Sequence, residues 1–335
     1  MKTCIVTRWL VICAAALTWS GISAATAADA QKPAKSQAKP AAKPQSGSKP
    51  TLADVPYGTH PKQVLDFYKA ESSTPTPVVF HIHGGGWMAG KKAPFNASEY
   101  LKAGISVVSI EYRFIPEATA DKVVPPVKGP LTDAARALQF VRSKAKQWNI
   151  DKTRIGATGG SAGACSSLWL AFHDDMADPK SSDPIAREST RLTCAAVGAP
   201  QTSLDPKQMK EWTPNSNYGG HAFGFSGDSK KHLSQFQQFL QERDKILPWI
   251  KEYSPYELVT ADDPPVFLSF GAPPALGQEQ KDPTHSANFG VKLQEKCRSV
   301  GVECYLAYPG ATDLKYHSIG EFLIAKLKGK ETEKK

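Results

Sequence analysis

The stretch RIGATGGSAGACSSLWLAF, residues 154–172, decides the fold. Its first part has the composition of a short buried strand and its last part that of an apolar helix. Between them, Gly159, Gly160 and Gly163 surround Ser161. Glycine is costly in regular structure and is used where the chain turns sharply or where another backbone approaches closely. The order strand, G-x-S-x-G, helix therefore predicts a tight turn that presents Ser161 beyond the end of a sheet, as a nucleophile elbow does.

A second glycine-rich motif, HGGGW at residues 83–87, follows an apolar segment. Consecutive glycines allow backbone N–H groups to point into a cavity without side chains in the way, as stabilisation of a tetrahedral oxyanion requires. The predicted donors are the amides of Gly85, Gly86 and Ala162. A phosphate-binding loop is the alternative, but the motif lacks the G-x-G-x-x-G and GK[ST] patterns.

The rest of the chain alternates between short apolar runs and helical periods. Strands are expected at 77–84, 105–113, 154–159, 193–200, 265–271 and 302–310. Helices are expected at 132–148 (with Thr132 as N-cap), 161–173, 286–299 and 318–328. Alternation of this kind predicts an α/β fold with a mostly parallel central sheet and helices on both faces. Ligands then bind beyond the carboxyl ends of the strands, where both glycine motifs lie.

Residues 201–262 interrupt this alternation. They are rich in Gly, Ser and Lys and carry several aromatic residues, which predicts a partial lid over the active edge of the sheet. One helix is expected inside it, at 230–250. Trp212 and Phe223 of this segment, with Trp87 of the glycine motif, are candidates for lining a substrate pocket. The alternative is a peripheral excursion without a functional role.

The N-terminal part of the chain has two predicted segments outside the folded domain. Residues 1–30 have the basic, apolar and small-residue regions of a signal peptide, with cleavage expected after Ala27 or Ala30. Residues 31–50 contain almost only Lys, Pro, Ala, Ser and Gln, a composition typical of a disordered linker. The catalytic domain is expected over 51–328, followed by a charged tail at 329–335, and the protein is expected to be secreted or periplasmic.

Charge is concentrated in that N-terminal part. The chain has a net charge of +9, and residues 1–50 hold seven basic residues and one acidic residue, so +3 remains for residues 51–335. A domain this close to neutral gives no indication of nucleic-acid binding. The basic linker is expected to make at most weak contacts with anionic cell-surface polymers.

Four cysteines remain once the signal peptide is set aside. An exported protein is permitted disulfides, and the favoured pairings are Cys297–Cys304 and Cys165–Cys194, with four free thiols as the alternative. No cysteine or histidine spacing indicates a metal site: the pair His81 and His83 lacks a further ligand nearby.

The two glycine motifs together resemble the α/β-hydrolase superfamily, in particular its carboxylesterase and lipase branch. That branch includes hormone-sensitive-lipase-like carboxylesterases and bacterial acetylxylan and feruloyl esterases. The resemblance extends over residues 55–328 and implies a catalytic triad in the order Ser, acid, His. Departures are Gly160, where relatives often carry an acidic residue, and the long loop after residue 271.

That order assigns the remaining members of the triad. The acid should follow the strand at 265–271, which selects Asp282 with Glu279 as its rival. The histidine should follow the strand at 302–310, which selects His317. His285 is expected to pack or to cap a helix, and His221 to lie on the surface of the lid.

The expected function is that of a serine carboxylic-ester hydrolase that acts through an acyl-enzyme intermediate on short-chain, acetyl or aryl esters, with acetylated polysaccharide as one candidate substrate. The chemistry requires no metal or organic cofactor. Three alternatives stay open: a formamidase, a serine peptidase, and a non-catalytic binding protein on a hydrolase scaffold.

Overall fold

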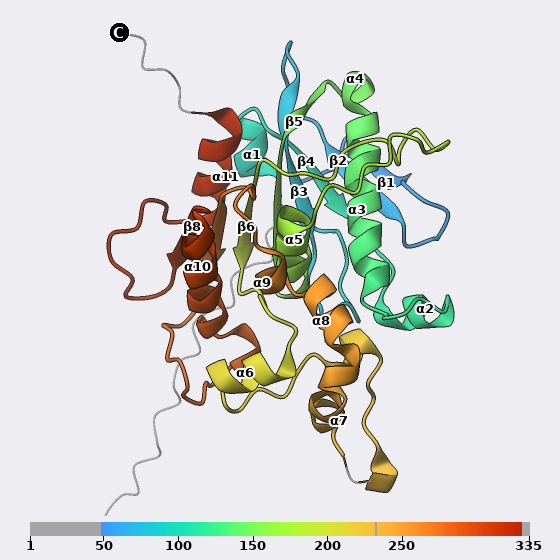
Figure 1. The fold of residues 1–335 in the computed structure, drawn as a ribbon. Coiled ribbons are helices and arrows are strands. Elements are labelled where there is room, and N and C mark those ends of the chain that lie inside the picture. Colours follow the sequence, from blue (N-terminus) through green and yellow to red (C-terminus); the bar gives the residue numbers. More distant parts are fainter. Residues whose placement is uncertain (1–47, 232, 330–335) are drawn as a thin grey trace, which may run out of the picture. The chain divides into compact units, whose positions relative to one another are not determined.

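A computed structural model describes residues 48–231 and 233–329, and its centre is an eight-stranded sheet (Figure 1). The strands are β1 Leu52–Pro56, β2 Val64–Tyr68, β3 Thr76–Ile82, β4 Ser106–Ile110, β5 Ile150–Gly160, β6 Cys194–Gly198, β7 Val266–Ser269 and β8 Cys304–Ala307. Their order is β1-β2-β4-β3-β5-β6-β7-β8. β1 and β2 run antiparallel to their neighbours, and all other pairs are parallel.

The predicted fold class is therefore confirmed, and the six predicted strands correspond to β3–β8. Sequence reasoning missed β1 and β2. Both have only five residues and stand toward one edge of the sheet, and four of the five β1 residues are exposed. Short edge strands lack the continuous apolar run by which a strand covered on both faces is recognised.

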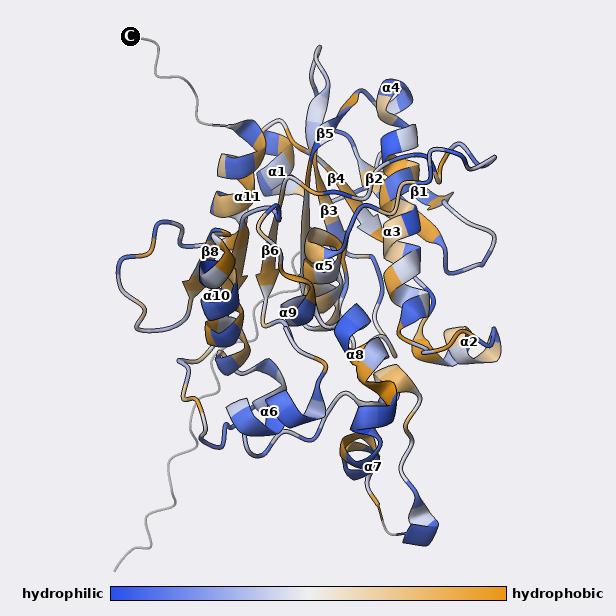
Figure 2. Ribbon diagram, in the orientation of Figure 1, coloured by the Kyte–Doolittle hydropathy of each residue, from blue (hydrophilic) through white to orange (hydrophobic). Residues whose placement is uncertain are grey.

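Helices cover both faces of the sheet. The α-helices outside the lid are α1 Ser98–Lys102, α2 Ile115–Ala120, α3 Lys128–Ser143, α4 Ala145–Trp148, α5 Ala162–Phe172, α10 Asn288–Val300 and α11 Ile319–Lys328. α1 and α11 share one apolar cluster with the sheet, and α3, α5 and α10 share the other. The strands between these layers are strongly hydrophobic, whereas the outer helices carry hydrophilic stripes (Figure 2). All five residues of β4 are buried, as expected for a strand covered on both sides.

The first helix boundary differs from the prediction. Thr132 is not an N-cap but lies inside α3, where its hydroxyl donates to the carbonyl of Lys128 at 2.7 Å. The helix starts earlier because Lys128-Gly-Pro already forms its first turn, and proline is well tolerated there because the first N–H groups have no partner inside the helix.

The segment 201–262 contains α6 Pro206–Trp212, α7 Gln235–Gln241, α8 Leu247–Tyr253 and α9 Pro255–Leu258, with the 3₁₀ turns η1 Gly220–Phe223, η2 Ser229–Lys231 and η3 Arg243–Ile246. α6, α7 and α8 lie beyond the end of the sheet that is opposite α4 (Figure 1). The single helix expected at 230–250 is wrong. The chain forms α7, η3 and α8 instead, because Ser234 caps α7 and Pro248 is accommodated only in the first turn of α8.

The cysteine pairings also differ from the prediction, because all four described cysteines are free. Cys165 and Cys194 belong to the two different apolar clusters, on opposite faces of the sheet, so they do not approach each other. Cys297 of α10 and Cys304 of β8 are neighbours, and their mutual hydrogen bond and burial raise the pKa of Cys304.

The predicted signal peptide and almost all of the charged tail lie outside the described residues, as does most of the linker. Residues 48–50 of the linker are described, and there the backbone N–H of Ser48 donates to Phe95 at 3.0 Å. Along the described ranges, no helix combines the length and the apolar character needed to cross a membrane.

One contact in the sheet positions the two glycine motifs. β3 and β5 are parallel neighbours, with Ile82 opposite Gly159. A Cβ on Gly163 would lie 2.1 Å from the carbonyl oxygen of Ile82 and 2.6 Å from that of His83, and a Cβ on Gly159 would lie 2.4 Å from the Ile82 oxygen. These glycines are therefore required because the end of β3 lies directly against the turn that follows β5.

We expect Gly163→Ala to destabilise the protein and Gly160→Ala to leave its stability nearly unchanged. Alanine would ordinarily favour helix α5 by about 1 kcal/mol, but at position 163 its Cβ collides with backbone that cannot move alone. The expected net loss is about 2 kcal/mol or more in the free energy of unfolding. A Cβ at Gly160 meets nothing within 4 Å. Urea unfolding of both variants checks this, and equal stability of the two would contradict it.

Candidate active site

Ser161 stands in the turn between β5 and α5 with φ 53° and ψ −121°. Positive φ is uncommon for a residue other than glycine and persists only where the surroundings enforce it. Here the backbone N–H of Ser161 donates to the carbonyl of Gly198 in β6 at 3.0 Å. The turn lifts the side chain above the carboxyl ends of the strands, in the way that the G-x-S-x-G pattern predicts.

His285 connects Ser161 to a carboxylate. Its Nε2 lies 2.9 Å from Ser161 Oγ, and its Nδ1 lies 2.8 Å from Asp282 Oδ2. An ionised carboxylate can only accept hydrogen bonds, so Nδ1 carries the proton of a neutral imidazole and Nε2 is left to accept the hydroxyl proton of Ser161. This is the arrangement of a nucleophile, its general base and the group that orients the base.

Asp282 and His285 belong to one short turn, η4 Pro283–His285. Asp282 is its N-cap, and Oδ1 accepts the backbone N–H of His285 at 3.2 Å while Oδ2 faces the ring. Partial burial raises the pKa of Asp282, but the hydrogen bonds and charge of His285 and the backbone N–H of Thr284 outweigh it and hold the pKa below its ordinary value. The carboxylate therefore stays ionised at neutral pH.

The structure brings together Ser161 and Asp282 of the predicted triad but not His317. The His317 side chain is 72 % exposed and its Nδ1 lies 3.4 Å from Glu321, one turn into α11. His285, expected to pack or cap, occupies the place next to the serine. Among the described contacts, the side chain of Glu279 makes no hydrogen bond to His285 or His317. Its backbone carbonyl accepts a hydrogen bond from Gln280 Nε2 at 3.2 Å. The sequence did contain one signal for His285, the spacing Asp-Pro-Thr-His over residues 282–285. In a 3₁₀ turn, residues i and i+3 lie next to each other, so this spacing brings the acid and the base together.

The glycine loop is held by its carbonyl groups. The Gly84 oxygen accepts from His83 Nδ1 at 2.8 Å, and the Gly86 oxygen from His221 Nε2 at 2.9 Å. The Gly85 oxygen accepts the N–H groups of Met88 and Ala89 at 3.0 and 3.1 Å. In a trans peptide the carbonyl and the following N–H point in opposite directions. Fixing the oxygens of Gly84 and Gly85 therefore turns the N–H groups of Gly85 and Gly86 the other way, and fixing the Gly86 oxygen does the same for the N–H of Trp87.

Those N–H groups have no acceptor. Within residues 48–231 and 233–329, the amides of Gly85 and Gly86 make no hydrogen bond. Ala162 is the first residue of α5, where an N–H lacks an intrahelical partner and the helix favours negative charge. A Cβ on Gly84 would lie 2.6 Å from the carbonyl oxygen of Gly160, so the loop and the elbow are in direct contact. The geometry is that of an oxyanion hole beside Ser161.

His221 is therefore not a surface residue of the lid, as the sequence suggested. Burial lowers its pKa, only partly offset by its bond to the Gly86 carbonyl. Its ring also lies 4.8 Å from that of Tyr218 in an edge-on arrangement. Segment 201–262 thus reaches the glycine loop and helps to fix it.

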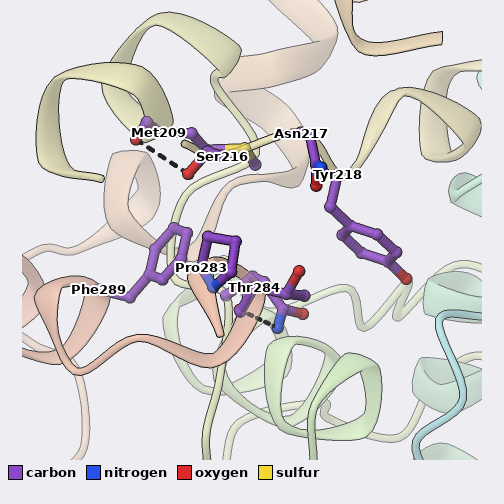
Figure 3. Close-up of a pocket in the computed structure, with 8 residues that line it drawn as sticks. Met209, Ser216, Asn217, Tyr218, Pro283, Thr284 and Phe289 are labelled. Atoms are coloured by element: carbon purple, nitrogen blue, oxygen red, sulfur yellow. Dashed lines mark hydrogen bonds between the residues drawn. The ribbon is translucent and has the colours of Figure 1, made fainter. Parts of the chain in front are cut away.

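Two cavities flank the turn that carries Asp282 and His285. The first measures about 10 Å³ and is lined by Gln201, Met209, Ser216, Asn217, Tyr218, Pro283, Thr284 and Phe289 (Figure 3). Gln201 Nε2 donates to the Thr284 carbonyl at 2.7 Å and closes one wall. The second is a wider depression of about 630 Å³ lined by Ala199, Gly271, Ala272, Gln280, Lys281, Asp282, His285 and Ser286. The turn therefore borders a narrow apolar cavity and a much wider depression in which polar side chains also stand.

The three aromatic residues predicted to line a pocket do not line either cavity. Trp87 is buried and donates to Ser166 Oγ in α5 at 3.0 Å, which ties the glycine loop to the elbow helix. Trp212 packs edge-on against Phe289, and Phe223 stacks on Phe239. All three are core residues, because they belong to the large apolar cluster that the lid shares with the helices on one face of the sheet. The pocket residues that sequence reasoning missed, such as Met209 and Thr284, carry no motif.

His81 and His83 have structural roles. His81 Nδ1 lies 2.8 Å from Ser109 Oγ, and burial lowers its pKa to about 3. His83 Nε2 lies 3.3 Å from Glu111, and its other nitrogen holds Gly84. The described residues contain no cluster of three or more His, Cys, Asp or Glu side chains suited to a metal ion.

Curated relatives align with part of this chain. Gut esterase 1 of Caenorhabditis elegans is 35 % identical over 158 residues, which is 44 % of this chain and 27 % of the relative. A protein of Arabidopsis thaliana named "Probable isoprenylcysteine alpha-carbonyl methylesterase ICMEL1" is 33 % identical over 141 residues, covering 41 % of this chain and 28 % of the relative. The chain thus matches little more than a quarter of the length of these relatives.

Solved structures share the fold. One titled "Truncated form of carbohydrate esterase from gut microbiota" superposes with a TM-score of 0.62 at 19 % identity, covering 86 % of this chain and 99 % of the other. An acetyl ester-xyloside bifunctional hydrolase from Caldicellulosiruptor lactoaceticus gives 0.55 at 24 % identity, covering 79 % and 84 %. The BD-FAE family model matches residues 65–281, more than half of the chain. The chain belongs to the BD-FAE family and has an α/β-hydrolase fold.

Proposed function

We propose that this protein is a serine carboxylic-ester hydrolase that acts on short acyl esters, acetyl esters of carbohydrates in particular. The observation that carries the proposal is the continuous chain of contacts from Asp282 through His285 to Ser161, beside backbone amides without acceptors. The names of the relatives, esterases and carbohydrate esterases, support the same class of reaction.

The proposed reaction follows from these contacts. Ser161 Oγ attacks the ester carbonyl carbon while His285 Nε2 takes its proton, and Asp282 holds the imidazole and stabilises the imidazolium. The carbonyl oxygen becomes an oxyanion that accepts from the amides of Gly85, Gly86 and Ala162. The C–O bond to the alcohol breaks as His285 returns the proton to it, and an acyl-enzyme remains. Water then attacks the acyl-enzyme with the same base, and the carboxylic acid leaves.

The two cavities support an assignment of the substrate's two parts. The alcohol leaves with a proton from His285, so it has to lie on the side of the wide depression that His285 and Asp282 line. Gln280, Lys281 and Ser286 there can hydrogen-bond to sugar hydroxyls. The acyl group is assigned to the narrow cavity, which at about 10 Å³ is far smaller than the depression of about 630 Å³ on the alcohol side. Such a small space favours a short acyl group over a long one.

Ser161→Ala tests the nucleophile. We expect the variant to lose turnover of p-nitrophenyl acetate while its melting temperature stays within about 2 °C of the native protein, because only one partly exposed hydroxyl is removed. A fluorophosphonate probe should label the native protein at Ser161, and a burst of p-nitrophenol equal to the enzyme concentration should precede the steady state. Full turnover by an unlabelled alanine variant would refute the proposal.

The two candidate histidines can be compared directly. His285→Ala should lower kcat for p-nitrophenyl acetate by at least about 10³-fold, because the base is lost. His317→Ala serves as the matched control and should keep kcat within about twofold, because its side chain is exposed and faces Glu321. A large loss from His317→Ala with a small one from His285→Ala would reverse the assignment.

Acyl-chain dependence tests the narrow cavity. For p-nitrophenyl acetate, butyrate and octanoate we expect kcat/KM to fall in that order. Acetylated xylan should release acetate, and methyl ferulate should be a poorer substrate because its acyl group is too large for the cavity. Octanoate hydrolysed faster than acetate would contradict the acyl assignment and leave the triad untouched.

We also propose that the protein is exported, on the strength of the leader at residues 1–30. The mature protein should then begin at Ala28 or Gln31 and be found outside the cytoplasm, which N-terminal sequencing of the fractionated protein measures. An intact Met1 in the cytoplasmic fraction would contradict export.

A further inference from the structure

Tyr218 places a phenol against the glycine loop. It lies in segment 201–262 between α6 and η1, and its ring packs edge-on against His221 with 4.8 Å between centroids. The residue forms part of the wall of the narrow cavity, but its ring projects away from Met209 and Phe289 (Figure 3). The hydroxyl is therefore carried toward another part of the site.

That part is Gly86. A Cβ built on Gly86 would lie 2.3 Å from Tyr218 Oη and 3.9 Å from His221 Nε2. The phenol oxygen thus occupies the space that any side chain at position 86 would need, directly over one of the two glycines whose N–H groups lack an acceptor. The carbonyl of Gly86 is held by a hydrogen bond from His221.

The hydroxyl of Tyr218 is unused in the described structure. Over residues 48–231 and 233–329 it has no hydrogen-bond partner, whereas Tyr57 donates to Glu111 O at 2.6 Å and Tyr112 to His83 O at 2.8 Å. Burial, with a smaller contribution from Cys165, raises the pKa of Tyr218. The phenol therefore keeps its proton at neutral pH and is available as a donor.

We propose that Tyr218 Oη donates a hydrogen bond to the oxyanion of the tetrahedral intermediate, in addition to the backbone amides. This rests on the proposed function. No proton is transferred: the phenol keeps its hydrogen and releases the oxygen when the carbonyl re-forms. Segment 201–262 then supplies one catalytic residue, Tyr218, to the oxyanion site, and His221 of the same segment packs against the Tyr218 ring.

Tyr218→Phe tests the proposal, because it removes the hydroxyl and keeps the ring that packs on His221. We expect kcat for p-nitrophenyl acetate to fall by about 10²-fold, the order seen when one oxyanion donor is removed, with KM within about threefold. The melting temperature should change by less than about 2 °C. Tyr100→Phe is the matched control: Tyr100 is a buried tyrosine in the cluster on the opposite face of the sheet, and its variant should keep native kcat.

A second measurement separates the oxyanion from other roles. Ser161 adds to the carbonyl carbon of a trifluoromethyl ketone and forms a stable adduct whose oxyanion lies in the oxyanion hole. The inhibition constant of this ketone should therefore be higher for Tyr218→Phe than for the native protein, by about the same factor as kcat/KM falls. The loss should also be equal for p-nitrophenyl and ethyl acetate.

Three results would overturn the proposal: native kcat, an unchanged inhibition constant, or a loss confined to the poor leaving group. Ser161→Ala distinguishes failure of the Tyr218 proposal from failure of the proposed hydrolase function. If that variant is inactive while Tyr218→Phe is native, the hydrolase assignment stands and the role of Tyr218 fails. If Ser161→Ala is fully active, the hydrolase assignment itself fails.

Discussion

The whole site depends on one steric constraint, the contact between the end of β3 and the turn after β5. Cβ atoms at Gly159 and Gly163 would collide with the Ile82 carbonyl at 2.4 and 2.1 Å, and one at Gly84 with the Gly160 carbonyl at 2.6 Å. Because the glycine loop starts where β3 ends, this contact fixes the position of the first residues of the loop relative to Ser161. Two motifs about 75 residues apart are thereby brought to one place, and a side chain at any of the three positions would separate them.

Contact alone does not orient the glycine loop, and hydrogen bonds to three of its carbonyl groups do so. The carbonyl of Gly84 is held by the neighbouring His83, that of Gly85 by the N–H groups of the following turn, and that of Gly86 by His221. Each hydrogen bond turns one peptide plane so that its N–H faces away from the bond. Preorganised donors of this kind need no reorientation as charge develops. The segment over the sheet thus helps to fix the glycine loop, through the bond of His221 to the Gly86 carbonyl.

The parts of this arrangement that sequence could predict are those with local causes. The elbow and the glycine loop were recognisable because only glycine tolerates such close backbone approaches, and β3–β8 because buried parallel strands are continuous apolar runs. β1 and β2 give a weaker signal, because each has only five residues and β1 is largely exposed. His317 was predicted in place of His285, because each follows a strand at the same edge of the sheet and the path of the intervening loops is a tertiary property. Likewise, large aromatic residues such as Trp87, Trp212 and Phe223 are suited both to a substrate pocket and to a core. Only their packing in the structure shows that these three are core residues.

The pairing of acid and base on one turn has a physical consequence for how the imidazole is held. The side chains of Asp282 and His285 are 62 % and 35 % exposed. An ion pair with this much exposure to water contributes at most about 1 kcal/mol to stability. Charge attraction is therefore too weak to set the ring by itself. The backbone does more: Asp282 caps the turn through the N–H of His285, Pro283 restricts φ, and Gln201 holds the Thr284 carbonyl at 2.7 Å. The carboxylate then meets a ring whose direction the turn has already determined, so orientation here is a property of the main chain and the charge of Asp282 selects the tautomer.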